Sequence, residues 1–192
     1  QRSMVKNQLH AEKSEAIPNK KSLKRIVERI KFLNIQEKEI KMDIAMLLKD
    51  NPDIKDRVKN ICTIPGVAEL TAVIVLAETN GFELIRNKKQ LTAYAGLDVR
   101  EKQSGTSVKG KPRISKKGNR QLRKAMHLPS LSSVKHNKSH RDLYARLVAK
   151  SGIKMKALIA VQRKMLELIF VIDKNKTEYD NEYQQKRIHY TN

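Results

Sequence analysis

The chain has 192 residues and carries 41 lysines and arginines against 20 acidic residues, a formal net charge of +21 with an isoelectric point near 10.1. Its apolar segments are too short or too interrupted by charge to cross a bilayer, which needs about 20 apolar residues in a row, so a membrane span is excluded. The single Cys62 excludes an internal disulfide, and without a secretory pattern a cytosolic chain is the simplest expectation. A polyanion that neutralises the charge is the expected partner, and nucleic acid is the first candidate.

The first 50 residues predict an arm followed by a coiled-coil-like helix. Residues 1–22 are polar and broken by Pro18, so they form either an arm or the end of a longer element, and a start at Gln1 rather than Met suggests a fragment with more chain upstream. Over residues 23–50, apolar side chains recur every seven positions with one interruption, at Glu37, which is typical of a coiled coil. The two registers are Leu23, Ile30 and Ile44, and Ile26, Leu33, Ile40 and Leu47. A single helix cannot bury such a stripe, so we expect an upstream helix, a second protomer or the chain's own domain to cover it.

A helix, a Pro-Gly turn and a second helix are predicted next. The first helix ends near Ile64 and the second runs over residues 70–78. This arrangement resembles a helix-hairpin-helix, in which backbone amides bind a phosphate. The candidate phosphate-binding residues are Gly66, Val67 and Ala68. A second glycine is common where this chain has Ala68, and a plain structural turn is the alternative.

Glycine, asparagine and serine residues delimit shorter helices further along the chain. We expect Gly96 to end a helix that begins at residue 88, and Asn119 to cap the start of another. Ser139 is predicted to cap a helix that Gly152 ends.

The most apolar helix is predicted over residues 154–173 and should fill the core. It completes a compact domain over residues 58–173, and residues 174–192 read as a polar tail. No strand pattern stands out, so we predict a mainly α-helical fold.

Positive charge is concentrated between Arg100 and Lys150, where 15 lysines and arginines accompany two acidic residues. The first part of this stretch is rich in glycine, which indicates a flexible basic loop that could order on a phosphate backbone, although a solvated surface without a partner is the alternative. The chain has three Phe and five Tyr, too few to favour base stacking as the binding mode. The candidate backbone contacts are Arg100, Lys102, Lys109, Lys111, Arg113, Lys116, Lys117, Asn119, Arg120 and Arg123.

Several runs, read in order, give the chain a family resemblance. They are Ile64-Pro65-Gly66-Val67, Leu91-Thr92-Ala93-Tyr94-Ala95-Gly96-Leu97, Ser104-Gly105, Ile114-Ser115-Lys116-Lys117-Gly118-Asn119-Arg120-Gln121-Leu122-Arg123, Tyr144-Ala145-Arg146-Leu147 and the stretch 156–166. Over about residues 58–172 the sequence resembles the C-terminal domain of insertion-sequence transposases of the IS one-ten type, the bridge-RNA-guided recombinases.

The resemblance implies a mechanism that this chain would share with a second domain. Ser104 would attack a DNA phosphate and form a covalent phosphoserine link. Ser107 is a nearby serine that could be mistaken for the nucleophile, and Ser115 is expected to be a loop or helix-capping residue. The base and a divalent metal, Mg²⁺ by expectation, would come from an N-terminal RuvC-like nuclease domain that this sequence lacks, so the chain alone should need no cofactor and be inactive.

The partners implied are DNA, a guide RNA and a second copy of the chain held through the coiled coil, in the prokaryotic cytoplasm at the nucleoid.

Other chemistries have less support in the sequence. His136 and His140 have the spacing of metal ligands on a helix, but no carboxylate or cysteine completes a set, so no metal site is expected. The phosphate-binding motif of nucleotide hydrolases is missing from the sequence. Two readings compete with the recombinase: a non-catalytic module that binds nucleic acid and dimerises, and an oligomerisation scaffold.

Overall fold

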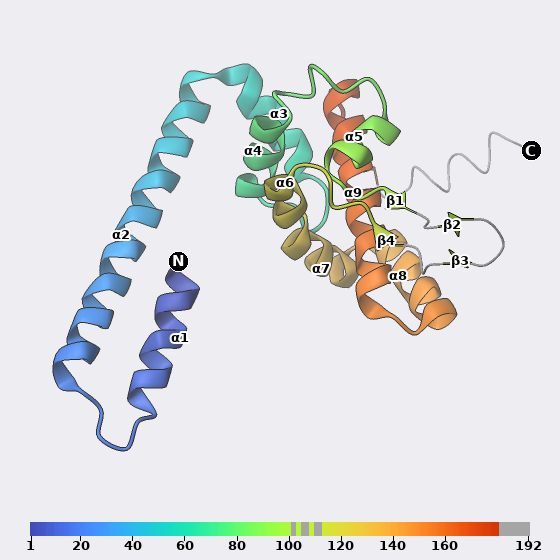
Figure 1. Ribbon diagram of the computed structural model, residues 1–192. Coiled ribbons are helices and arrows are strands. Elements are labelled where there is room, and N and C mark those ends of the chain that lie inside the picture. The colour runs from blue at the N-terminus through green and yellow to red at the C-terminus, as the bar shows by residue number, and fades with distance from the viewer. Residues whose placement is uncertain (101–102, 105–107, 110–112, 181–192) are drawn as a thin grey trace, which may run out of the picture. The chain divides into compact units, whose positions relative to one another are not determined.

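The computed structural model describes residues 1–100, 103–104, 108–109 and 113–180, with the backbone alone at residues 103, 104, 108 and 109. These residues form a mainly α-helical protein, as predicted (Figure 1). The chain divides into two compact units, Gln1–Lys55 and Asp56–Asn192.

The first unit is a pair of helices joined by a short turn. Helix α1 (Arg2–Lys13) lies along the first half of α2 (Lys20–Asp50), and the two helices run side by side in Figure 1. Asn19 caps α2, because its side chain accepts hydrogen bonds from the first backbone amides of the helix. Residues 2–13 are therefore helical where the polar composition indicated an arm.

The heptad stripe of α2 is covered over part of its length. Val5 of α1 and Ile26 of α2 are buried in this unit, so an upstream helix covers the first heptads. Further along α2, Ile40 is 58% exposed and Leu47 is 63% exposed. The second half of the stripe is therefore an open apolar surface within the unit.

The second unit is built around α9 (Lys154–Asn175), the orange-to-red helix of Figure 1. Helices α5 (Lys88–Tyr94), α7 (His127–His136) and α8 (Lys138–Ser151) pack against it. The predicted core helix is thus confirmed. Its fully buried residues are Ala157, Val161, Met165, Leu166 and Ile169.

A partly buried ion pair ties the first helix of this unit to α9. Helix α3 (Pro52–Cys62) starts directly after α2 and carries Arg57, whose guanidinium donates to both carboxylate oxygens of Asp173 at 2.8 and 2.9 Å. The same guanidinium donates to the carbonyl of Gly81 at 2.9 Å. Such a bidentate, charge-assisted pair fixes orientation as well as proximity.

Two very short antiparallel ladders interrupt the helices. Strand β1 (Val99–Arg100) pairs with β4 (Arg113–Ile114), and β2 (Gln103–Ser104) pairs with β3 (Val108–Lys109). Two residues per strand are too few to show an alternating pattern, so the sequence offered no strand signal here.

Most of the predicted helix ends are confirmed. Gly96 follows α5 with φ +65°, Gly152 ends α8 with φ +66°, and the Asn119 side chain caps α6 (Arg120–Ala125). The predicted cap at Ser139 is wrong, since Asn137 caps α8 instead. Asn137 has the extended backbone of a cap residue, and its side chain accepts a hydrogen bond from the His140 amide at 3.1 Å.

The segment after α9 is attached to the helical body as far as it is described. The Tyr179 backbone amide donates to Thr63 Oγ1 at 2.8 Å, and the side-chain Nδ2 of Asn137 donates to the Tyr179 hydroxyl at 2.7 Å. The start of the predicted polar tail is therefore bonded to the domain. No described helix has the length and apolar content needed to span a membrane.

Candidate nucleic-acid interface

Two arginines face each other where the basic segment joins the helical body. In the β1–β4 ladder, Arg100 lies directly opposite Arg113, and both side chains are exposed. Residues opposite each other in an antiparallel pair have their side chains on the same face, and like charges there are destabilising. No carboxylate among the described residues forms an ion pair with either guanidinium. The pair is therefore a local concentration of positive charge that an anion would stabilise.

The candidate nucleophile belongs to the neighbouring ladder. Ser104 lies opposite Val108, and Gln103 lies opposite Lys109. The backbone places Ser104 and Lys109 on the segment that leaves the body through β1 and returns through β4. Lys102 and Lys111, two further predicted contacts, lie outside the described residues.

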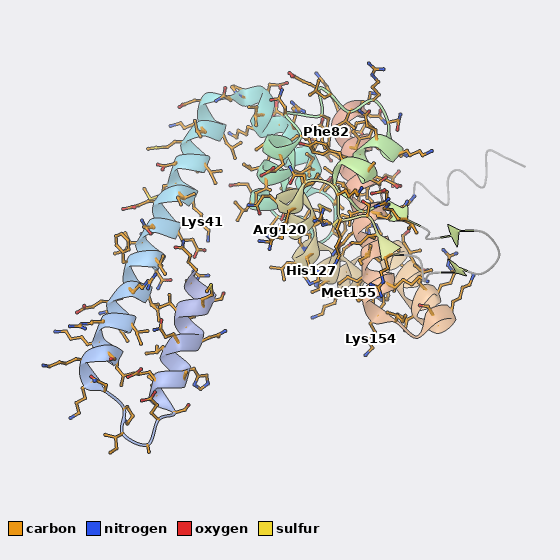
Figure 2. All side chains as sticks on the ribbon, in the orientation of Figure 1. Lys41, Phe82, Arg120, His127, Lys154 and Met155 are labelled. Carbon is orange, nitrogen blue, oxygen red and sulfur yellow. The ribbon has the colours of Figure 1, made fainter. Side chains whose placement is uncertain are left out.

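Cations continue along the chain after β4. Lys116 adopts a left-handed backbone with φ 55°, and it and Lys117 are both exposed. Arg120 is exposed at the first position of α6 (Figure 2). Its side chain has no hydrogen-bond or ion-pair partner in the part of the chain that the structure describes. These three side chains are available to a polyanion.

Two of the predicted nucleic-acid contacts are instead engaged inside the domain. The Asn119 side chain accepts from the Leu122 amide at 2.9 Å and donates to Glu78 Oε2 at 2.6 Å. The Arg123 guanidinium donates to the carbonyl oxygens of Ala95, at 2.8 Å, and Gly118, at 3.3 Å. Their contact with nucleic acid stays a prediction, and it would have to share or break these bonds.

Asp98 and Ser115, to which the sequence analysis gave no joint role, meet beside the β1–β4 ladder. The Ser115 hydroxyl hydrogen-bonds to the Asp98 carboxylate, and the Ser115 amide donates to the Asp98 carbonyl at 2.8 Å. The two residues are 17 positions apart, and neither helical nor strand periodicity links them. Only an antiparallel pairing of the flanking segments would have suggested the contact.

The Pro-Gly turn packs closely against α7. It joins α3 to α4 (Glu69–Glu78), and Gly66 has φ +100°. A Cβ at Gly66 would lie 2.7 Å from the Ser133 amide nitrogen and 2.8 Å from the Pro129 carbonyl oxygen. Close packing against α7 therefore explains why position 66 requires glycine, and a bound ligand is not needed to explain it.

Phosphate binding by the turn stays a prediction. Val67 is buried and its amide donates to the Ile64 carbonyl at 3.0 Å. Ala68 is exposed at the start of α4, where the helix has no side-chain cap. Of the three candidates in the turn, Ala68 is thus the best placed to meet an anion.

His136 and His140, which share metal-ligand spacing, are in different environments. His136 is exposed at the end of α7, whereas His140 is buried with its Nδ1 2.5 Å from the Ser133 hydroxyl. Burial, followed by the charge of Lys164, lowers the pKa of His140 from 6.5 to about 4. Among the described residues, no group of three or more His, Cys, Asp or Glu side chains could hold a metal ion.

Comparison with known proteins agrees with the resemblance seen in the sequence. Residues 58–145 match the model of the transposase IS116/IS110/IS902 family. The pilin gene-inverting protein of Moraxella bovis is 28% identical over 147 residues, which are 76% of this chain and 44% of that protein. The insertion element IS110 uncharacterized 43.6 kDa protein of Streptomyces coelicolor is 29% identical over 121 residues, 63% of this chain and 30% of that protein.

The match centres on the second unit, which holds the arginine pair and the candidate nucleophile. The chain spans less than half of the length of these curated relatives. The family match, the helical fold and the order of the matching runs agree with one another. Residues 58–145 of this chain are therefore similar to the IS116/IS110/IS902 transposase family.

Proposed function

We propose that the chain is part of a DNA recombinase in which it binds the nucleic-acid backbone and supplies Ser104 as the nucleophile. The observation that carries the proposal is the opposed pair Arg100 and Arg113, exposed at the ends of the segment that contains Ser104. A phosphate between two guanidinium groups would neutralise both charges, and Arg binds phosphate in bidentate geometry. The Moraxella relative, named as a pilin gene-inverting protein, supports DNA rearrangement as the reaction class.

The chemistry begins at the Ser104 hydroxyl. Its oxygen attacks the phosphorus of a DNA phosphodiester, a serine–phosphate ester forms, and the bond from phosphorus to one deoxyribose oxygen breaks. The serine proton passes to a base, and the departing oxygen takes up a proton. Attack of a different DNA hydroxyl on the phosphoserine reverses these steps and joins new ends. The nearby guanidinium and ammonium groups stabilise the negative charge that develops on the phosphate oxygens.

The base and any metal are proposed to come from outside this chain. Lysine and arginine predominate in the sequence on either side of Ser104, and protonated side chains are poor bases. In the proposed complex the acidic ligands of a nuclease domain would hold Mg²⁺, which would supply activation of the serine and charge stabilisation. A guide RNA and a second protomer are further proposed partners, the latter through the open half of the α2 stripe.

The test replaces Ser104 in the protein encoded by the complete native reading frame, and it measures DNA strand exchange and DNA binding separately. Ser104→Ala should abolish exchange and leave binding unchanged, because the hydroxyl reacts but contributes little affinity. The matched control is Ser107→Ala, three residues away in the same segment, which should retain exchange. Undiminished exchange in Ser104→Ala would refute the catalytic role.

A non-catalytic module that binds nucleic acid and dimerises is the second candidate. The observation that favours it is the combination of exposed cations after β4 with the open apolar surface at Ile40 and Leu47. A non-catalytic module should bind nucleic acid and self-associate, and neither the native protein nor any variant should carry out DNA strand exchange. The absence of a phosphoserine adduct when the native protein is incubated with nicked DNA would favour this candidate over the recombinase.

A further inference from the structure

We propose that Arg123, the Asp98–Ser115 contact and the Gly96–Gly118 contact together hold both ends of the basic segment, which runs from β1 to β4; we call these contacts the bracket. Arg123 is therefore a positioning residue and not a phosphate contact. The proposal rests on the proposed function, because the segment it positions is the one that carries Ser104. It concerns the described residues that flank the segment on both sides, at positions 94–100 and 113–123.

The first contact of the bracket joins the residue before β1 to the residue after β4. Ser115 is held to Asp98 twice, by its amide on the Asp98 carbonyl at 2.8 Å and by its hydroxyl on the Asp98 carboxylate. A hydrogen bond to a carboxylate is charge-assisted and stronger than one between neutral groups. These two bonds therefore fix the register of the strands β1 and β4 from the residues that flank the ladder.

The second contact is a crossing of two backbones that only glycine permits. A Cβ on Gly118 would lie 2.1 Å from the Tyr94 carbonyl oxygen, and a Cβ on Gly96 would lie 2.7 Å from the Gly118 amide nitrogen. The Lys116 amide donates to the Gly96 carbonyl at 3.1 Å, and the Asn119 amide donates to the Tyr94 carbonyl at 2.7 Å. The chain leaving β4 is thus fixed against the end of α5.

Arg123 spans this crossing. One nitrogen of its half-buried guanidinium, Nη1, donates to the Ala95 carbonyl at 2.8 Å on one segment and to the Gly118 carbonyl at 3.3 Å on the other. Ala95 is the C-cap residue that follows α5, and carbonyl oxygens at this end of a helix lack helical partners and carry the negative end of the helix dipole. The positive charge of Arg123 therefore has a function inside the fold.

Arg120 supplies the contrast on the same helix. It lies one turn earlier in α6, is exposed, and makes no hydrogen bond or ion pair with the described residues. Sequence alone treats the two arginines alike, since both are basic residues of one run. The structure separates an available cation from one that is already bonded to two carbonyl groups.

The test compares these two arginines in the full 192-residue chain. Binding to a DNA duplex of arbitrary sequence is measured by fluorescence anisotropy over a range of NaCl concentrations. Each lost phosphate contact lowers the slope of log K against log salt by about 1, so Arg120→Gln should lower it by about 1. Arg123→Gln should leave the slope unchanged, because glutamine removes the charge but keeps an N–H donor for the carbonyl groups.

Amide hydrogen exchange supplies a readout that does not depend on DNA. In Arg123→Ala the amides of Ser115, Lys116 and Asn119 should exchange at least about tenfold faster, because the bracket opens locally, whereas core amides such as that of Leu166 keep their protection. Arg123→Gln should exchange more slowly than Arg123→Ala at the same amides. In Arg120→Ala these amides should be unaffected.

Each outcome decides a separate point. A slope that falls by about 1 in Arg123→Gln, or unchanged exchange of the three amides in Arg123→Ala, would overturn the positioning role. If Arg123→Ala unfolds globally, Arg123→Gln supplies both readouts. A wild-type chain whose DNA binding does not respond to salt would contradict the proposed function, while the exchange data would still decide whether the bracket exists.

Discussion

The buried His140 predicts how the stability of the protein depends on pH. His140 is 3% exposed, lies against the Ser133 hydroxyl and has a pKa lowered from 6.5 to about 4 by burial and by Lys164. Between these two pH values the unfolded chain binds a proton at this residue and the folded protein does not. Acid therefore favours unfolding across this window, and the stabilisation is fully present only above pH 6.5.

The size of the effect follows from the two pKa values. The difference between a pKa of 6.5 in the unfolded chain and one of about 4 in the folded protein sets an upper limit of about 3 kcal/mol. Lowering the pH from 8 to 5 should reduce the free energy of unfolding by about 2 kcal/mol. Glu37, an exposed residue of α2 paired with Lys41 and Arg2, has a pKa below its usual value of 4.5, so its contribution is lost only in stronger acid. Between pH 5 and 6.5, His140 therefore contributes more than Glu37 to the change in the free energy of unfolding.

Urea denaturation of the full chain, followed by circular dichroism at half-unit steps from pH 5 to 8, measures this dependence. His140→Gln should be less stable at pH 8 but should lose most of the pH dependence between pH 5 and 6.5. The control His136→Gln replaces the exposed histidine of α7 and should keep the wild-type slope. The same pH slope in wild type and His140→Gln would refute the reasoning.

Two further predictions concern packing and assembly. Gly66→Ala should destabilise the protein by about 3 kcal/mol, because the added Cβ would overlap the α7 backbone. Gly152→Ala, whose Cβ would meet no atom within 4 Å, should cost about 1 kcal/mol. Equal losses of stability in urea denaturation would contradict close packing at Gly66. Ile40→Asp should dissociate a homo-oligomer held through the open half of the α2 stripe, while Ile35→Asp, the same substitution at an exposed residue outside the stripe, should not. Light scattering measures both, and a monomeric parent protein would end that proposal.

The sequence by itself determined the helical elements of the second unit and most of their ends. The long apolar run of α9, the cap at Asn119 and the glycines after α5 and α8 are local signals, because each depends on side chains within one or two turns. The cap of α8 was misassigned to Ser139 because Asn137, two residues earlier, offers the same chemistry. Local rules name the kinds of residue that cap a helix, but they do not rank two that lie close together.

The sequence also determined that the chain is strongly basic and where its charge is concentrated. It predicted that a stripe on α2 needs a partner, but not that α1 covers the first half and leaves Ile40 and Leu47 exposed. A polar helix such as α1 has a weak local signal, since most of its stability comes from packing on its neighbour.

Only the tertiary structure decided which basic residues are available to a ligand. Arg100 and Arg113 are brought opposite each other by strand pairing, and Arg123 is engaged by carbonyl groups that belong to a different segment. The physical reason is that exposure and partnership depend on contacts between residues far apart in the chain. Composition measures how much charge the protein carries, whereas the fold determines which charges remain without an internal partner.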